Sequence, residues 1–181
     1  MIETERLILR PWQESEAAIL YRYASDPDVG PVAGWAPHAS VADSLEIIRT
    51  VFAAPEVYAV VLKDTGEPVG SCGIMVSDGL HSADMKQGEA EIGYWIGKPY
   101  WGQGLIPEAV EALLARCFNN LALDAVWCGY YEGNNKSKRV CEKCGFRFHH
   151  TNHGILSPLG DTRTEHFYKM TREDYIAMHG H

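Results

Sequence analysis

The 181-residue sequence lacks a long apolar run and lacks an excess of positive charge. No apolar stretch approaches the ~20 residues that a helix needs to cross a bilayer, and the acidic start, residues 1–6, does not resemble a secretory signal. Asp and Glu number 24 against 16 Lys and Arg, so the net charge is −8. Because binders of nucleic acid or anionic membrane need a positive surface, this balance argues against both partners. We therefore expect a cytoplasmic protein.

The acidic balance fits a cationic or amine-bearing substrate, although many cytoplasmic proteins are acidic for solubility alone. A local exception is the basic cluster of Lys136, Lys138 and Arg139. The length suits one domain, since domains cluster at roughly 100–200 residues. A hydrophobic content of 46% is enough for a packed core. We expect a single domain over residues 1–181.

Cysteine is present in an odd number, which does not suggest a disulfide framework. The five residues are Cys72, Cys117, Cys128, Cys141 and Cys144. Cys141-x-x-Cys144, followed by three histidines between residues 149 and 153, raises a zinc hypothesis. Against it, the second half of a zinc ribbon is missing, and helical spacing places both thiols on one apolar face. Free cysteine often behaves as a small buried hydrophobe. We expect no metal.

Hydrophobic periodicity predicts seven strands and four helices in the order β-α-α-β-β-β-α-β-α-β-β. The strands are expected over 6–11, 57–62, 69–76, 89–97, 125–130, 146–149 and 165–170, and the helices over 15–25, 40–52, 106–119 and 134–144. The second helix should bury a stripe of Val41, Leu45, Ile48 and Phe52. This order indicates an α/β (α+β) domain with a mixed, mostly antiparallel central sheet flanked by helices.

The junction over 97–105 carries the clearest chemical signal. A strand ends there, Gly102 and Gly104 follow, and an amphipathic helix begins at once. The first amides of a helix have no internal partners and point outward with the positive end of the helix dipole, which creates an anion site. The pattern is neither GxxxxGK[ST] nor GxGxxG, so a P-loop or dinucleotide fold is poorly supported. The alternative is a tight turn in which glycine serves geometry only.

The context of this junction resembles a known family. Trp-Gly-x-Gly-x-x-x-Glu-Ala begins at Trp101, Asn-x-x-Ser begins at Asn134, and Glu-Lys-x-Gly-Phe begins at Glu142. Together these motifs resemble the GNAT superfamily of N-acetyltransferases. The opening Glu-Arg-Leu-x-Leu-Arg from Glu5 and Glu-Ile-Gly-Tyr-Trp-Ile from Glu91 look like the branch of ribosomal-protein-alanine (Rim-like) acetyltransferases. The resemblance spans residues 4 to about 175.

The resemblance implies transfer of an acetyl group from acetyl-CoA to a primary amine, either a protein N-terminus such as ribosomal-protein alanine or a small molecule. It also implies the residues that bind the cosubstrate. Amides of the loop would hold the pyrophosphate, the end of the preceding strand would pair with the pantetheine arm, and the Asn-x-x-Ser segment would lie near the thioester. These residues are Trp95, Ile96, Gly97, Trp101, Gly102, Gln103, Gly104, Leu105, Asn134, Asn135 and Ser137. Pro99 departs from the family pattern, which usually has Gln or Arg there.

Acetyl transfer to an amine needs a base that removes a proton and an acid that protonates the leaving thiolate. Glu89 and Glu91 are the candidate bases, and Glu91 is preferred because it lies nearer the expected thioester. A solvent-facing strand edge is the alternative reading of both. The family often has a tyrosine as the acid, but that position is Cys141 here. Tyr130 or Ser137 is the candidate replacement, or water helps the thiolate depart.

The sequence is compatible with more than one function, acceptor and oligomeric state. A catalytically weak coenzyme A-binding sensor or scaffold is the alternative function, motivated by Cys141. Trp35, Tyr100 and Trp101 line an acceptor pocket or serve as packing anchors. The acceptor itself depends on the variable loops over 29–39, 77–87 and 151–162, which one sequence does not resolve. A homodimer is compatible with the sequence.

Overall fold

The structure is a computed structural model that describes residues 1–76 and 84–180. The chain forms two compact units: Met1–Gly73 with Tyr94–Ala112, and Ile74–Gly93 with Leu113–His181. Each unit is described by itself. Within the loop predicted over 77–87, residues 77–83 lie outside the described residues.

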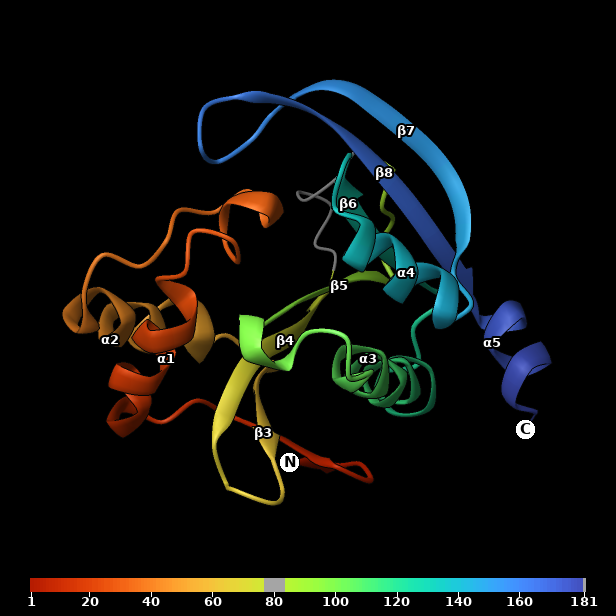
Figure 1. The fold of residues 1–181 in the computed structure, drawn as a ribbon. Helices are drawn as coiled ribbons and strands as arrows, with labels where there is room; N and C mark the ends of the chain where they lie inside the picture. The colour runs from red at the N-terminus through yellow and green to blue at the C-terminus, as the bar shows by residue number, and fades with distance from the viewer. Residues whose placement is uncertain (77–83, 181) are drawn as a thin grey trace. The chain divides into compact units, whose positions relative to one another are not determined.

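Eight strands and five α-helices occur in the described part of the chain. The strands are β1 (Ile2–Glu3), β2 (Leu7–Arg10), β3 (Val57–Leu62), β4 (Pro68–Val76), β5 (Glu89–Ile96), β6 (Ala125–Tyr131), β7 (Arg147–Leu156) and β8 (Thr162–Thr171). The helices are α1 (Ala17–Ala24), α2 (Val41–Arg49), α3 (Leu105–Ala115), α4 (Asn135–Lys143) and α5 (Arg172–His179). The ribbon in Figure 1 labels most of them.

Hydrogen bonding connects the strands in the order β1-β2-β3-β4-β5-β6-β8-β7. The β5/β6 pair is parallel, whereas the registers of β1 to β4 and of β6 to β8 are antiparallel. The prediction of a mixed, mostly antiparallel sheet flanked by helices is therefore confirmed. The sequence prediction missed β1, which has only two residues, and α5, in which Tyr175 is the one buried residue.

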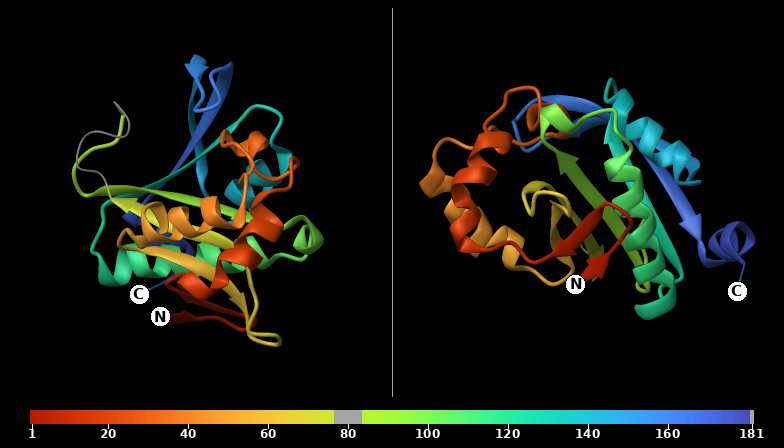
Figure 2. Two further views of the ribbon diagram at one scale, coloured as in Figure 1. Left: turned by 90° about the vertical axis from the view of Figure 1, so that its left-hand side faces the viewer. Right: turned by 60° about the horizontal axis from the view of Figure 1, so that its bottom comes forward.

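The first unit has its core between the early strands and the two N-terminal helices. Ile8 of β2 packs partly against this core, whereas Leu7 and Leu9 are fully buried on the opposite face of the strand, because successive residues of a strand point to opposite sides. Helices α1 and α2 lie side by side (Figure 1 and Figure 2) and pack on the same core. The buried members of this core are Trp12, Ala17, Leu20, Ala24, Ile48, Ala59 and Val61.

Helix α2 begins as the sequence predicts but buries fewer residues. The Ser40 hydroxyl accepts a hydrogen bond from the Asp43 amide at 3.0 Å and caps the helix. Ile48 is buried, and Leu45 and Phe52 pack partly against the core. Val41, however, is 44% exposed. It is the first residue of the helix, and that end of the buried stripe extends past the core.

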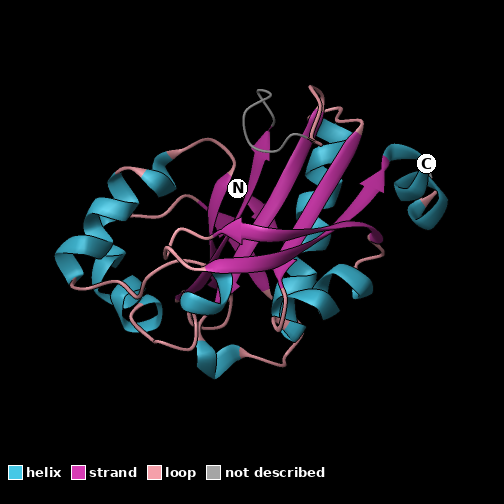
Figure 3. Ribbon diagram, turned by 90° about the horizontal axis from the view of Figure 1, so that it is seen from above, coloured by secondary structure: helices cyan, strands magenta, loops and turns pink. Residues whose placement is uncertain are grey.

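The second unit contains a long antiparallel hairpin formed by β7 and β8, drawn in blue in Figure 1. Both strands extend well past the predicted 146–149 and 165–170. The added residues, such as those over 150–156, are mostly polar and partly exposed, so they show no apolar alternation that reveals a strand. Helix α5 follows β8 at the C-terminal end (Figure 3). No helix in the described ranges is long and apolar enough to cross a membrane.

Helices α3 and α4 match their predicted ranges closely. An apolar stripe at helical spacing along α3, which continues into a π-helical turn over Arg116–Asn120, is buried throughout. Its members are Val110, Leu113, Leu114, Cys117 and Phe118. Gly145, which follows the C-cap residue of α4, has a φ of 87°. This left-handed conformation favours glycine and ends the helix, as its place in the sequence predicts.

Candidate functional site

The loop before α3 is a backbone turn that requires its two glycines. After a single 3₁₀ turn over Lys98–Tyr100, the φ angles of Gly102 and Gly104 are 76° and 75°. Residues other than glycine rarely adopt a backbone conformation with such a positive φ. Gly102 is exposed, and a Cβ built on it would meet no atom within 4 Å. The backbone of the loop is therefore open to a close approach by a ligand.

The loop amides have the arrangement that an anion needs. Within the described part of the chain, the amide N–H groups of residues 102–105 donate to no protein acceptor. The first bond of α3 in this region runs from the Glu108 amide to the Gly104 carbonyl, at 3.2 Å. The unpaired donors lie at the positive end of the helix dipole. A phosphate group is the natural acceptor for such a set of donors.

A network within the first unit holds this loop. The Glu108 carboxylate accepts hydrogen bonds from the Thr4 hydroxyl at 2.6 Å, the Arg6 amide at 2.8 Å and Arg6 Nε at 2.7 Å. Arg6 Nη1 in turn donates to the Gln103 carbonyl at 2.9 Å. Burial acts to raise the pKa of Glu108, but the hydrogen bonds from Thr4 and Arg6 hold that pKa below its ordinary value. Sequence reasoning missed this network, although Arg6 and Glu108 both belong to the motifs.

Aromatic residues anchor the same loop. Trp101 Nε1 donates to the Ile96 carbonyl at 3.0 Å, and the Tyr100 hydroxyl lies 3.1 Å from that of Tyr23. A Cβ on Gly97 would lie 2.7 Å from the Tyr23 ring, so glycine is required for this close packing. These contacts give Tyr100 and Trp101 a role as packing anchors.

The end of β5 leaves one edge for an extended ligand. The Gly97 amide donates to the Val69 carbonyl at 2.8 Å, which continues the pairing with β4. Because main-chain groups of successive strand residues point to opposite edges, those of Ile96 face away from β4. The parallel register with β6 covers Glu89 to Glu91 only. Of the three residues predicted to pair with pantetheine, Ile96 therefore directs its main-chain groups away from β4, and its carbonyl already accepts the hydrogen bond from Trp101 Nε1.

Glu89, in the second unit, is a paired carboxylate. It is 6% exposed and accepts hydrogen bonds from Trp127 Nε1 at 2.7 Å and from the Lys86 amide at 3.1 Å. Lys169 Nζ lies 3.2 Å from its other oxygen. Burial acts to raise the pKa of Glu89, but these hydrogen bonds and the Lys169 cation keep it below the ordinary value. Such a group is suited to holding β5, β6 and β8 together.

Glu91 lies two residues after Glu89 on β5, but its environment raises the pKa of its carboxyl group instead of lowering it. Burial, with the nearby charge of Glu165, raises the pKa of Glu91 to about 7. Burial also raises the pKa of Glu165, whose Oε1 lies 3.5 Å from the position of a Cβ on Gly129. Among the residues that the structure describes, no cation pairs with Glu91. A carboxylate that titrates near neutrality is suited to general base catalysis.

The Asn-x-x-Ser segment opens α4 in the second unit. The Asn134 side chain accepts a hydrogen bond from the Ser137 amide at 3.3 Å and caps the helix. Asn135 is the first helical residue, and Ser137 is buried. The cap thus fixes the start of the helix whose residues were predicted to approach the thioester.

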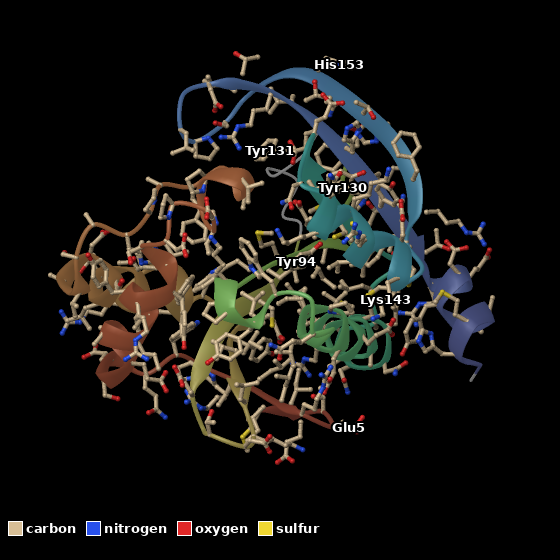
Figure 4. All side chains as sticks on the ribbon, viewed as in Figure 1. Glu5, Tyr94, Tyr130, Tyr131, Lys143 and His153 are labelled. Carbon is tan, nitrogen blue, oxygen red and sulfur yellow. The ribbon has the colours of Figure 1, made fainter. Side chains whose placement is uncertain are left out.

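Tyr130 and Cys141 lie on the α4 side of the second unit. Cys141 is fully buried, and its thiol contacts Cys128 Sγ at 3.2 Å. Tyr130, two residues after Cys128, shares its face of β6 and donates its hydroxyl to that of Tyr168 at 3.4 Å. Figure 4 labels Tyr130 on this strand. Burial raises the pKa of Tyr130, so its hydroxyl is protonated at neutral pH.

The four candidate catalytic residues therefore fall into two pairs. Cys128 and Tyr130 of β6 face α4. Trp127 occupies the alternate position on the same strand, so its side chain, which donates a hydrogen bond to Glu89, points to the opposite face. The glutamates of β5 lie on that other side, whereas Tyr130 and Ser137 lie with α4.

The zinc hypothesis gains no support from the described residues. They contain no group of three His, Cys, Asp or Glu side chains that could hold a metal ion. Cys141 and Cys144 are buried on the apolar face of α4, whereas His149 is exposed on β7. His149 Nδ1 instead lies 2.8 Å from His150 Nδ1.

Comparison with known proteins identifies the family. Residues 6–147 match the family model described as an acetyltransferase (GNAT) domain. An uncharacterised N-acetyltransferase, p20 of Bacillus licheniformis, is 29% identical over 149 residues, which is 80% of each chain. The putative ribosomal N-acetyltransferase YdaF of Bacillus subtilis is 43% identical over 75 residues, 41% of this chain and 39% of its own.

A solved structure agrees with the observed fold. The GNAT-family acetyltransferase of Bacillus anthracis superposes with a TM-score of 0.83 at 23% identity, covering 95% of this chain and 98% of its own. The chain belongs to the GNAT family of acetyltransferases, which transfer an acetyl group from acetyl-CoA to an amine.

Proposed function

Because the chain is a GNAT acetyltransferase, we propose that it acetylates a primary amine by direct attack of the amine on the thioester, with Glu91 as the base. The observation that carries this proposal is the environment of Glu91, whose pKa burial and Glu165 raise to about 7. Glu89 is the weaker candidate because its carboxylate is already held by Trp127 and Lys169.

The described residues fit acetyl-CoA as the donor. The unpaired amides of residues 102–105 would receive the pyrophosphate, whereas the Trp101 amide at the start of the loop already donates to the Lys98 carbonyl at 3.2 Å. Main-chain groups at the end of β5, those of Ile96 above all, would pair with the pantetheine arm as an added strand does. Asn134, Asn135 and Ser137, at the start of α4, are further candidate ligands of acetyl-CoA.

Proton transfer in the reaction divides between the two groups of candidates. Glu91, directly or through one water, takes the proton of the attacking amine. A main-chain amide of β5 would stabilise the oxyanion that forms on the thioester carbonyl. The departing thiolate of coenzyme A, with a thiol pKa of ~8.5, then needs a proton. Tyr130 and Ser137 are the candidate donors, and burial, which raises the pKa of Tyr130, keeps its hydroxyl protonated but makes it a weaker acid than the thiol, so water is the third candidate.

The acceptor class that we propose first is the N-terminal amine of a protein, such as a ribosomal protein. The 43% identical segment shared with the putative ribosomal N-acetyltransferase of Bacillus subtilis supports it. A small-molecule amine is the second class, and the net charge of −8 is compatible with either cationic acceptor.

A thiol-release assay over a panel of amines tests this function. Peptides with N-terminal alanine or serine, polyamines and aminoglycosides would be compared, each with the wild-type chain and with Glu91→Gln. We expect turnover of at least one peptide and strong loss of that turnover in the variant. Binding of acetyl-CoA without turnover of any amine would instead support a coenzyme A-binding sensor or scaffold.

A further inference from the structure

Arg6 makes a contact in the first unit that bears directly on the donor loop. We propose that Arg6 is a positioning residue: its guanidinium orients the peptide between Gln103 and Gly104 so that the Gly104 N–H faces the pyrophosphate of coenzyme A. This inference rests on the proposed function of the loop. Its geometric basis is the 2.9 Å hydrogen bond from Arg6 Nη1 to the Gln103 carbonyl.

The peptide bond that joins Gln103 to Gly104 is planar. The carbonyl of Gln103 and the N–H of Gly104 belong to one trans peptide plane and point in opposite directions. Fixing the carbonyl toward Arg6 therefore fixes the N–H on the other side of the plane. That N–H is one of the loop donors without an acceptor in the described part of the chain.

The loop needs such a constraint because of its glycines. Gly104 has a φ of 75°, and glycine occupies positive and negative φ about equally well. A flip of the Gln103–Gly104 peptide changes mainly the ψ of Gln103 and the φ of Gly104, so it meets little steric resistance. Such a flip would turn a carbonyl oxygen toward the anion. The hydrogen bond from Arg6 opposes it.

Arg6 is itself held in place. Its Nε donates to Glu108 at 2.7 Å, and its amide donates to the other oxygen of the same carboxylate at 2.8 Å. Glu108 lies in the first turn of α3, directly after the loop. The guanidinium thus joins the helix and the loop through two nitrogens in a fixed fork, a geometry that the single ammonium of lysine does not reproduce.

The chain contains a matched control on β2, the strand that directly follows Arg6. Arg10, at the end of β2, also forms an ion pair with a glutamate, Glu16, and its Nη1 also donates to a main-chain carbonyl, that of Pro11, at 3.0 Å. That carbonyl is not part of the donor loop. Arg10→Met therefore removes a comparable set of interactions in the same unit without touching the Gln103–Gly104 peptide.

The experiment measures binding of coenzyme A and of pantetheine, which lacks the pyrophosphate, to each variant of the full chain. Calorimetry serves for coenzyme A, and ligand-observed NMR titration serves for the weaker pantetheine. We expect Arg6→Met to raise the Kd of coenzyme A about tenfold, the equivalent of about 1.4 kcal/mol, and to leave the Kd of pantetheine unchanged. Arg10→Met should change neither.

The Arg6→Lys variant distinguishes the orienting role of the guanidinium from the effect of its positive charge. It also provides the test of the proposal if Arg6→Met does not fold. It should weaken coenzyme A binding to a similar extent, because the positive charge remains but the fork is lost. Wild-type affinity in Arg6→Lys, or an equal loss for both ligands in Arg6→Met, would overturn the proposal and leave the loop assignment standing. If the wild-type chain itself binds both ligands equally, the loop assignment fails and the role of Arg6 fails with it.

Discussion

The Glu91→Gln variant should change how the stability of the chain depends on pH. Glu91 has a pKa of about 7 in the folded chain against an ordinary value of 4.5, because burial and the Glu165 charge disfavour its ionised form. Ionising it in the folded chain therefore costs about 3 kcal/mol relative to the unfolded chain. A raised pKa contributes stability that is present below 4.5 and is lost as the pH rises through 7.

The size of the effect follows from these two values. Between pH 5 and pH 8 the wild-type chain should lose about 2 to 3 kcal/mol of unfolding free energy through Glu91 alone. The glutamine variant should lack this loss, because an amide does not titrate. Any fixed cost of burying the amide is the same at each pH, so the difference in pH dependence isolates the carboxyl group.

Urea unfolding of both proteins at pH 5, 6, 7 and 8 measures this difference. Glu89→Gln is the matched control on the same strand. The pKa of Glu89 is lowered, so its contribution is present above its ordinary pKa and is lost as the pH falls below that value. This variant should therefore be less stable than the wild type at pH 8. Parallel pH curves for wild type and Glu91→Gln would show that Glu91 titrates as an ordinary carboxyl group, which removes the basis for its role as the base.

Three further substitutions test other parts of the account. Gly104→Val should weaken coenzyme A binding at least tenfold, because the φ of 75° is strained for a β-branched residue at the phosphate site; unchanged affinity in calorimetry would contradict the loop assignment. Gly97→Ala should lower the unfolding free energy by about 1 to 3 kcal/mol, because its Cβ would lie 2.7 Å from the Tyr23 ring; chemical denaturation measures this, and a neutral result would refute the close packing. Tyr130→Phe should lower turnover without changing coenzyme A affinity; full activity would return the role of proton donor to Ser137 or water.

The sequence predicts best those parts of the fold that carry regular apolar patterns. Strand β3 occurs over Val57–Leu62, where the sequence predicts it, because a run of β-branched residues is bounded by turn residues. Helix α5 was missed because its apolar periodicity is weak, although Thr171 and Asp174 form a capping box at its start. That box is a local signal that could have revealed the helix.

The candidate site also contains features that the sequence predicts and features that it does not. The anion loop is predictable because Gly102 and Gly104 directly precede a strongly amphipathic helix. The choice between the two glutamates of β5 is not predictable, since it depends on partners from distant segments. Lys169 and Trp127 hold Glu89, whereas Glu91 has Glu165 as its charged neighbour. The contact between Arg6 and the Gln103 carbonyl joins residues 97 positions apart and leaves no local pattern.

The central claim is that Glu91 removes the proton of an amine that attacks acetyl-CoA. The most direct test is the pH dependence of kcat/KM for the wild-type chain and for Glu91→Gln, with the best acceptor from the panel. In the wild type, kcat/KM should fall as the pH drops through about 7, since protonation disables the base. The variant should be slow and should lack that limb. A variant with wild-type rates and the same limb would contradict the claim.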